Sequence, residues 1–266
     1  MIQYLNTAVQ AARSASKIIL DALDRLDTIS VYEKSPNNFV TSIDQAVERE
    51  IIGQISDAYP NHKFLSEESH AEEALNDQDS FWIIDPLDGT TNFMHGLPHF
   101  AISISYYEAG QVQCAVVYDP VANELFTAMK GKGARLNQQR LRVSKHKKLR
   151  GALLCTGFPC RKPEEQKFFV ALINDLFKEV SGIRKTGSAA LDLAYVAAGR
   201  FDALVDSDLK LWDTAAGSLL VTESGGILTD FSGNSDSANG IHSAEIMCAN
   251  PSVYAAVSKV VAANKA

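Results

Sequence analysis

An apolar run, Phe81 to Ile84, is followed directly by Asp-Pro-Leu-Asp-Gly-Thr-Thr-Asn at positions 85–92. The run predicts a buried strand, and Asp-Pro followed by Asp-Gly predicts that this strand stops there in a tight turn. The turn would hold two carboxylates, Asp85 and Asp88, at the end of a rigid element. Carboxylates bind hard cations, and backbone amides with hydroxyls bind phosphate oxygens. The segment therefore predicts a place where a divalent metal ion and a phosphate meet.

The charge balance supports this interpretation. The chain has 25 Lys and Arg against 32 Asp and Glu, a formal net charge of −7, and its 266 residues suffice for one large domain or two ordinary ones. Such a charge balance argues against a duplex nucleic-acid binder, which usually shows a basic face. An acidic enzyme that handles phosphate needs local positive charge, and a bound metal ion supplies it.

The cysteines and the apolar runs favour a soluble cytoplasmic protein. The four cysteines (Cys114, Cys155, Cys160 and Cys248) form no C-x-x-C pair and no zinc-like spacing, so we expect reduced thiols. The first residues lack the basic segment and continuous apolar core of a signal peptide. No apolar run approaches the ~20 residues that span a bilayer.

Before residue 145 the pattern predicts two helices and then consecutive strands. Helices are expected over residues 2–24 and from Ser42 or Asp44 to about Tyr59, and residues 70–80 are expected to form a loop or a short helix. Strands are expected over residues 62–65, 81–84, 101–107, 113–118 and 125–129. Strands that follow one another without intervening helices indicate an antiparallel sheet.

After residue 150 strands alternate with helices, which indicates an α/β arrangement. Strands are expected over 153–156, 183–185 and 203–206, and helices over 164–180, 189–198, 213–224 and from Pro251 onward. The basic segment Ser144 to Arg150 is expected to be a solvated connector rather than a nucleic-acid patch. It would separate an N-terminal α+β domain (1–145) with most metal ligands from a C-terminal α/β domain (146–266) that contributes Asp213 and substrate contacts.

Three further acidic segments stand at predicted strand or helix ends: Asp44 in Thr-Ser-Ile-Asp, the pair Glu67-Glu68, and Asp213 in Trp-Asp-Thr-Ala-Ala-Gly. Each alone is more often a helix cap or a solvated charge. Two carboxylates ~4 Å apart repel by about 4 kcal/mol at an effective dielectric of 20, so a convergent set would need cations or raised pKa values. A ligand set of oxygens alone favours Mg²⁺ or Mn²⁺ over Zn²⁺.

Together these segments resemble the inositol monophosphatase family over nearly the whole chain. The string from Trp82 to Phe93 is similar to the first family signature, and Trp212–Gly217 with Glu223–Gly226 is similar to the second. Further matches are Phe39–Thr41 with Asp44, Glu67–Ser69, Thr186–Leu193, Ala194–Gly199 and Thr156–Pro159, of which the last three most resemble the bacterial SuhB branch. The resemblance implies a layered α/β/α/β/α sandwich, as in fructose-1,6-bisphosphatase, and a homodimer.

The resemblance also implies a site with two or three Mg²⁺ ions, for which Mn²⁺ is an alternative. The implied metal ligands are Glu67, Asp85, the Leu87 carbonyl, Asp88 and Asp213. The implied catalytic residues are Asp44, Thr90 and Glu67, with Thr90 and Asp44 orienting a metal-activated water and taking its proton. The implied substrate contacts are Leu87, Asp88, Gly89, Thr90, Gly187, Ser188, Ala189, Asp206 and Asp213. Many relatives have Glu where this chain has Asp206, so its contact with a polyol would be longer or water-mediated.

The implied activity is the hydrolysis of myo-inositol 1-phosphate and related polyol phosphates, with inhibition by Li⁺. Alternative substrates on the same fold are fructose 1,6-bisphosphate, 3′-phosphoadenosine 5′-phosphate, histidinol phosphate and NADP. Phosphatases with a covalent aspartyl-phosphate use Asp-x-Asp, and the spacing from Asp85 to Asp88 is one residue longer, which disfavours that class. Because the SuhB branch is associated with ribosomal-RNA transcription complexes, a regulatory protein with an RNA polymerase partner is the other hypothesis.

Overall fold

The computed structural model describes residues 1–35, 38–69, 80–157, 163–235 and 244–265. Of the loop or short helix expected over residues 70–80, only Ser80 falls within these ranges, and Cys160 lies outside them.

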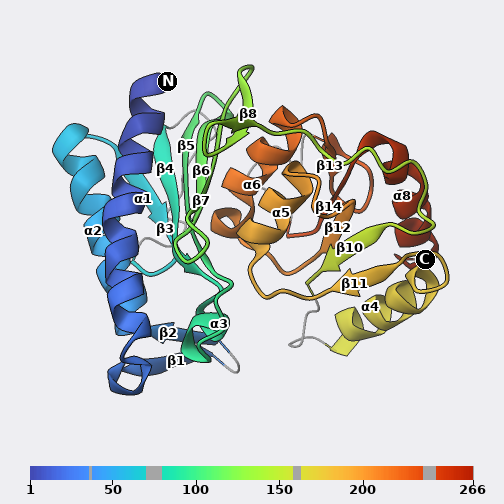
Figure 1. Cartoon of the computed structure of the whole chain (residues 1–266), viewed down its shortest axis with the longest axis horizontal. Helices are drawn as coiled ribbons and strands as arrows, with labels where there is room; N and C mark the ends of the chain where they lie inside the picture. Colours follow the sequence, from blue (N-terminus) through green and yellow to red (C-terminus); the bar gives the residue numbers. More distant parts are fainter. Residues whose placement is uncertain (36–37, 70–79, 158–162, 236–243, 266) are drawn as a thin grey trace.

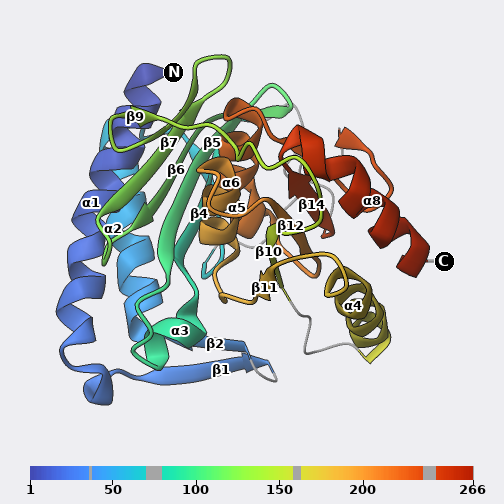
Figure 2. The same cartoon turned by 45° about the vertical axis from the view of Figure 1, so that its right-hand side comes forward.

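Five layers stack in the order α/β/α/β/α (Figure 1). The first layer contains α1 (Ile2–Leu23) and α2 (Ser42–Ala58), which cover one face of a seven-stranded sheet. The middle layer contains α5 (Ala189–Ala197) and α6 (Leu211–Glu223), which lie between this sheet and a five-stranded one. The last layer contains α4 (Pro163–Leu176) and α8 (Pro251–Lys265), on the outer face of the second sheet (Figure 2). The predicted layered sandwich is confirmed.

The seven-stranded sheet has the order β3-β4-β5-β6-β7-β8-β9. Its strands are β3 (Lys63–Ser66), β4 (Phe81–Asp88), β5 (Ala101–Glu108), β6 (Gln111–Asp119), β7 (Glu124–Met129), β8 (Gly133–Leu136) and β9 (Gln139–Arg140). The pairs from β4 to β9 are antiparallel, as expected, but β3 runs parallel to β4. A hairpin joins only antiparallel strands, so the parallel register excludes one between β3 and β4.

Strand β4 does not stop at Ile84 as the sequence predicted. Asp85 pairs with Ser103 and Asp88 pairs with Ala101, with an irregular register between the two pairs. Pro86 lies in this bulge, where the missing amide hydrogen is tolerated. The tight turn follows the end of β4, at Gly89, whose φ of +99° favours glycine. The two aspartates are therefore carried by a bulged strand, not by a free turn.

The five-stranded sheet has the order β11-β10-β12-β14-β13. Its strands are β10 (Leu153–Thr156), β11 (Gly182–Arg184), β12 (Ala203–Asp206), β13 (Ile227–Thr229) and β14 (Ile246–Ala249). Strand β10 is parallel to β11 and β12, which agrees with the predicted α/β alternation, but β14 is antiparallel to β12 and β13. The predicted helix over residues 164–180 ends earlier, at Leu176.

Among the described residues, the sequence analysis did not identify β8, β9, β13 and β14, nor four elements that complete the fold near the N-terminal layer. These four are the 3-10 helix η1 (Leu26–Thr28), the antiparallel pair β1 (Val31–Ser35) and β2 (Asn38–Thr41), and the short helix α3 (Thr90–Met94). Strand β2 runs directly into α2 and α3 follows β4, so both border the carboxylate-bearing segments.

Alternation along β4 divides its side chains between two cores. Phe81 and Ile83 pack in the middle core with α5 and α6, whereas Trp82 and Ile84 pack in the core under α1 and α2. A third core lies between the five-stranded sheet, α4 and α8. Because α5 and α6 belong to the second half of the chain but pack on the first sheet, the predicted domains share the middle core. Their division at residue 145 stays a prediction.

The described cysteines Cys114, Cys155 and Cys248 are all free and buried. Within the described residues, no helix combines the length and the apolar character that crossing a bilayer requires. The cytoplasmic location stays a prediction.

Candidate active site

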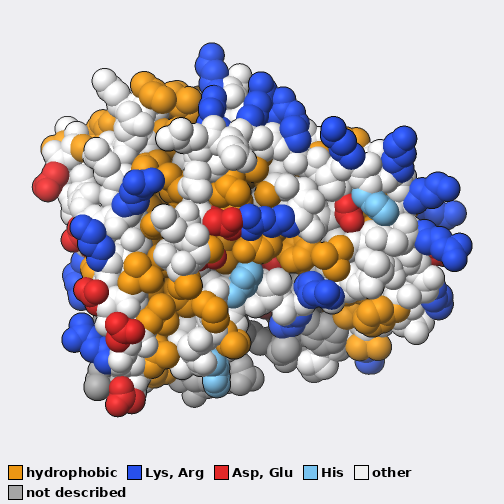
Figure 3. All heavy atoms as spheres, viewed as in Figure 1, with side chains coloured by type: hydrophobic (Ala, Val, Ile, Leu, Met, Phe, Trp, Pro, Cys, Tyr) orange, Lys and Arg blue, Asp and Glu red, His pale blue; other side chains and the backbone are white. Residues whose placement is uncertain are grey.

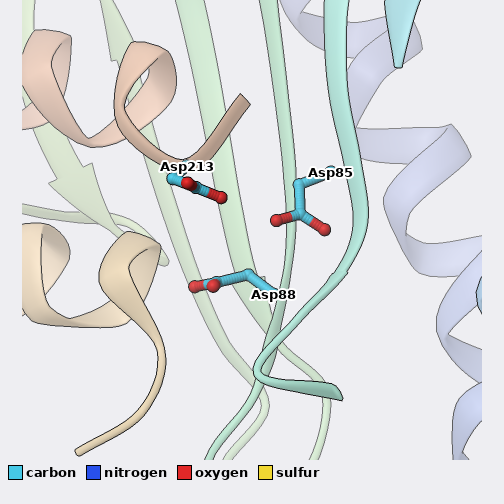
Figure 4. Close-up of side chains that lie close together, drawn as sticks. All are labelled: Asp85, Asp88 and Asp213. Carbon is cyan, nitrogen blue, oxygen red and sulfur yellow. The ribbon is translucent and has the colours of Figure 1, made fainter. Parts of the chain in front are cut away.

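The candidate site lies where the bulged end of β4 faces the first turn of α6. Asp85 and Asp88 come from β4, and Asp213 comes from α6. One carboxylate oxygen from each of the three residues lies within 4.8 Å of the others. Figure 4 shows the three side chains pointing toward one another across the gap between the strand and the helix. Asp85 and Asp88 are buried and Asp213 is partly exposed, so the cluster has one open side.

Two of these carboxylates are oriented by backbone amides through one oxygen each. The Leu87 amide donates to Oδ1 of Asp85 at 3.0 Å. The Lys210 amide donates to Oδ2 of Asp213 at 2.7 Å, which is the bond that an acidic residue at the third position of a helix makes to the helix cap. In each case the other oxygen takes no part in the bond and can face the cluster.

Asp88 is oriented from the second half of the chain. Its Oδ2 accepts hydrogen bonds from the Ser188 hydroxyl at 2.5 Å and from the Ala190 amide at 2.8 Å. Ser188 is the buried N-cap of α5, so α5 begins against the metal-ligand candidate on β4. Ser188, expected as a substrate contact, thus has a structural contact with Asp88 in the described structure.

Burial and mutual repulsion raise the pKa values in the cluster. Burial raises the pKa of Asp85 well above its usual range, and the charges of Glu67, Asp88 and Asp213 raise it further. Burial and the Asp88 charge do the same to the pKa of Asp213. Burial raises the pKa of Asp88 to about 6, although its hydrogen bonds favour the charged form. A divalent cation would offset this repulsion, and the donors are all oxygens, so the residues fit Mg²⁺ or Mn²⁺.

The structure also brings Glu67 to the cluster. Its amide donates to the Ile84 carbonyl at 3.2 Å, which extends the pairing of β3 with β4 by one residue. The side chain is half-buried, and its charge raises the pKa of Asp85, Asp88 and Asp213. The family position of Glu67 is therefore compatible with the predicted ligand role.

Glu48 is a buried residue near this segment that the sequence analysis missed. Its Oε1 accepts hydrogen bonds from the Ser66 hydroxyl, from the Glu68 amide at 3.2 Å and from the Ser69 amide at 3.3 Å. It thereby anchors the residues on both sides of Glu67. A signal existed, because Glu48 follows Asp44 by four positions on the same face of α2.

Asp44 and Thr90 meet as predicted. The Thr90 hydroxyl lies 3.0 Å from Oδ1 of Asp44 and 3.1 Å from the Leu87 carbonyl, and its single proton can serve only one of them at a time. Oδ2 of Asp44 accepts from the Thr41 amide at 2.9 Å and from the Thr41 hydroxyl at 2.5 Å, in a capping box at the start of α2. Burial raises the pKa of Asp44, and these hydrogen bonds oppose the rise.

Asp206 lies at the end of β12, close enough to the cluster for the charges to interact. Burial raises its pKa to about 7, the Lys185 charge lowers it and the Asp88 charge raises it. A Cβ atom added to Gly157 would lie 1.9 Å from Oδ1 of Asp206, so the carboxylate packs directly on this glycine. The sequence analysis did not single out Gly157, since only the folded chain places it against Asp206.

The remaining predicted substrate contacts lie in two turns at the site. Gly89 has φ +99°, and an added Cβ would meet the His99 carbonyl at 3.1 Å, so both its conformation and the space require glycine. Gly187 has φ +92° and is exposed, and Ala189 is the first residue of α5. The turns adjoin one another through the bond from Ser188 to Asp88. Their contacts with a substrate stay predictions.

Comparison with known proteins gives a consistent result over the full length. Residues 1–266 match the profile of the Inositol monophosphatase family. The chain is 47% identical over 253 residues to the Nus factor SuhB of Escherichia coli (strain K12), covering 95% of this chain and 93% of that protein.

Two solved structures are similar in fold. A Thermotoga maritima IMPase has a TM-score of 0.88 at 35% identity, with 99% of this chain and 98% of that chain covered. The IMPase-II of Staphylococcus aureus with inositol monophosphate bound has a TM-score of 0.80 at 28% identity, with 97% and 93% covered.

Proposed function

The chain belongs to the inositol monophosphatase family, and we propose that it hydrolyses myo-inositol 1-phosphate and related polyol phosphates with the help of Mg²⁺. The observation that carries the proposal is the cluster of Asp85, Asp88 and Asp213, three convergent carboxylates that are each oriented through one oxygen. The related IMPase-II that holds inositol monophosphate supports the substrate class.

The proposed ligands are Glu67, Asp85, the Leu87 carbonyl, Asp88 and Asp213, for two or three ions. Bound there, Mg²⁺ or Mn²⁺ would supply positive charge to the phosphate and lower the pKa of water. The protein contributes a pre-oriented set of oxygens, because the bonds from Leu87, Ser188, Ala190 and Lys210 fix the carboxylates before any ion binds.

We assign the handling of a proton to Asp44 and Thr90. The Thr90 hydroxyl can accept a hydrogen bond from a water while it donates to Oδ1 of Asp44, 3.0 Å away. The water is thereby oriented, and its proton can pass by way of Thr90 to Asp44, whose raised pKa makes it a better proton acceptor than a solvated aspartate. The amides of Gly89 and Thr90 would donate to the phosphate oxygens.

Asp206, with Gly187, Ser188 and Ala189, would contact the hydroxyls of the polyol. Asp206 is buried against Gly157 and lies within the influence of the Lys185 charge. A buried hydrogen-bonding group of this kind discriminates strongly against substrates that leave it unpaired. The choice of polyol is therefore attributed to Asp206 and its surroundings rather than to the carboxylate cluster.

The test is a steady-state panel of phosphomonoesters with the purified protein. Hydrolysis of myo-inositol 1-phosphate should require Mg²⁺, should stop in excess EDTA and should be inhibited by Li⁺. Undiminished turnover in excess EDTA would contradict the metal-dependent mechanism. A strong preference for fructose 1,6-bisphosphate, 3′-phosphoadenosine 5′-phosphate, histidinol phosphate or NADP would keep the mechanism but replace the substrate.

The homodimer is proposed on family resemblance alone, and the cytoplasmic location rests on the cysteine pattern of the sequence. Light scattering on the purified protein tests the dimer, since a mass near that of one 28.9 kDa chain at micromolar concentration would contradict it. Cell fractionation tests the location.

A second candidate function is regulatory binding to the transcription machinery. The related protein is named a Nus factor, and the described structure has a feature suited to an acidic partner. Residues 130–150 hold nine of the 25 Lys and Arg and none of the Asp or Glu, and all nine are exposed. Figure 3 shows Lys and Arg gathered along the upper and right edges of that face, where this segment leads from β8 toward the C-terminal layers.

The binding function can be tested apart from catalysis. An Asp213→Asn variant should still retain RNA polymerase in a pull-down if binding is independent of turnover. Replacement of Lys145, Lys147 and Lys148 by Glu should abolish retention and leave phosphatase activity intact. Equal retention by the wild type and the triple variant would separate binding from this basic segment.

A further inference from the structure

Asn92, in the short helix α3 that follows β4, is bonded to a loop from the other half of the chain. Its side-chain amide donates to the His99 carbonyl at 2.7 Å and to the Thr186 carbonyl at 2.8 Å. The two amide hydrogens are thus both used, and the side chain is buried in α3. The bond to Thr186 spans 94 positions in the sequence, so it links α3 to the segment that precedes α5.

The loop packs directly on this side chain. A Cβ atom added to Gly187 would lie 2.9 Å from Nδ2 and 3.1 Å from Oδ1 of Asn92, and Gly187 has φ +92°. A contact below 3.0 Å would force a neighbour to shift, and Asn92 is held by two hydrogen bonds, so glycine permits the close approach of the loop. Thr186 is fixed on its other side as well, because its hydroxyl donates to Oδ1 of Asp192 in α5 at 2.7 Å.

The next residues of the same loop hold Asp88. The Ser188 hydroxyl and the Ala190 amide both donate to Oδ2 of Asp88. Residues 186–190 are therefore attached to residues 88–92 at two places, by Asn92 at one end and by Asp88 at the other. A shift of the loop away from Asn92 would change the direction of the donors that orient the Asp88 carboxylate.

We propose that Asn92 is a positioning residue that sets the cation affinity of the site, acting through the 186–190 loop on Asp88. The inference rests on the proposed function, since it requires Asp88 to be a cation ligand. Groups that orient a metal ligand without touching the metal typically contribute about 10–100-fold to its affinity. A merely structural asparagine would affect stability and leave cation affinity unchanged.

The experiment measures Mn²⁺ binding by calorimetry, without substrate. Asn92→Ala and Asn92→Leu, the second close to asparagine in size, should each weaken Mn²⁺ binding by about tenfold or more. Asn250→Ala is the matched control, because Asn250 is also buried, donates from Nδ2 to the Ser144 hydroxyl at 2.7 Å and caps α8. It should lower the thermal midpoint without changing the Mn²⁺ affinity.

A double-mutant cycle tests whether Asn92 acts on Asp88 through the 186–190 loop. Ser188→Ala removes one donor to Asp88 at the other end of the loop. If Asn92 acts through this loop, the double variant Asn92→Ala/Ser188→Ala should bind Mn²⁺ about as weakly as the weaker single variant. If the fold-losses in Mn²⁺ affinity of the two single variants multiply in the double variant, Asn92 and Ser188 act independently, and action through the loop is wrong. In turnover, the Mg²⁺ concentration for half-maximal rate should rise more than kcat falls.

The outcomes separate the inference from the proposed function. If the wild type binds Mn²⁺ and hydrolyses phosphomonoesters but both Asn92 variants bind Mn²⁺ within about twofold of it, the positioning role is wrong and the function stands. If the wild type neither binds Mn²⁺ nor hydrolyses any phosphomonoester, the proposed function fails, and the positioning role with it. If Asn92→Ala does not fold, Asn92→Leu provides the same comparison.

Discussion

The buried carboxylates on α2 and those of the cluster between β4 and α6 have different neighbours. Asp44 uses both oxygens to accept hydrogen bonds, from Thr41 and Thr90, and Glu48 accepts three from the segment around Glu67. Asp85 and Asp213 each accept one backbone bond through one oxygen, and burial together with the charges of Glu67 and Asp88 raises the pKa of both. Burial alone therefore does not distinguish a fully hydrogen-bonded acid from a candidate metal ligand. The distinguishing property is whether another carboxylate or a donor faces the second oxygen.

Loss of turnover is the greatest change that we predict. Asp213→Asn should lower kcat by several orders of magnitude, since it removes a charge that the proposed site uses for its cations. Asp202→Asn is the control, because Asp202 accepts from Ser144 and from the Leu153 amide away from the cluster and should keep near-normal kcat. Steady-state hydrolysis of myo-inositol 1-phosphate at saturating Mg²⁺ measures both. Near-normal turnover of the Asp213 variant would mean that the cluster is not the catalytic site.

Replacing an acid should change the free energy of unfolding in opposite directions in the cluster and on α2. In EDTA, Asp85→Asn should raise the free energy of unfolding, because it removes one of several repelling charges. Asp44→Ala should lower it by about 1–3 kcal/mol, because buried donors on Thr41 lose their acceptor. Urea unfolding monitored by circular dichroism measures both. With Mg²⁺ present, the advantage of Asp85→Asn should disappear as the wild type gains the stabilisation of bound ions. The same sign for both variants in EDTA would contradict the distinction.

The weakest effect that we predict is the pH dependence of the stability contributed by Asp206. The pKa of Asp206 is raised to about 7, above its value in an unfolded chain, so the native state holds a proton that the unfolded state releases. Its contribution to stability is therefore fully present below about pH 4 and is lost as the pH rises through about 7. In EDTA, the thermal midpoint of the wild type relative to Asp206→Asn should fall between pH 5 and pH 8. A constant difference across this range would show that Asp206 does not titrate there.

The local features of the site follow from short stretches of sequence. The Asp-Pro-Leu-Asp-Gly string specifies two carboxylates on a strand end and a glycine with positive φ, and Thr41 with Asp44 specifies a capped helix. Because a proline usually ends a strand, the sequence pattern predicts the end of the strand at Ile84, which is wrong. The neighbouring strand β5 continues the pairing past the proline through a bulge. The residues around Pro86 do not show which strand will lie beside them, so this pairing could not be predicted locally.

Short stretches of the chain specify the chemistry of each position and carry the resemblance that implies the family and the layered fold. The packing of the layers specifies which atoms meet: Ser188 with Asp88 across 100 positions, Asn92 with Thr186 across 94, and Gly157 with the Asp206 carboxylate. A carboxylate or an amide takes whichever donor or acceptor the packed layers place within about 3 Å of it. That choice depends on the stacking of α3, α5 and the two sheets, whereas turns and caps depend on residues only a few positions apart.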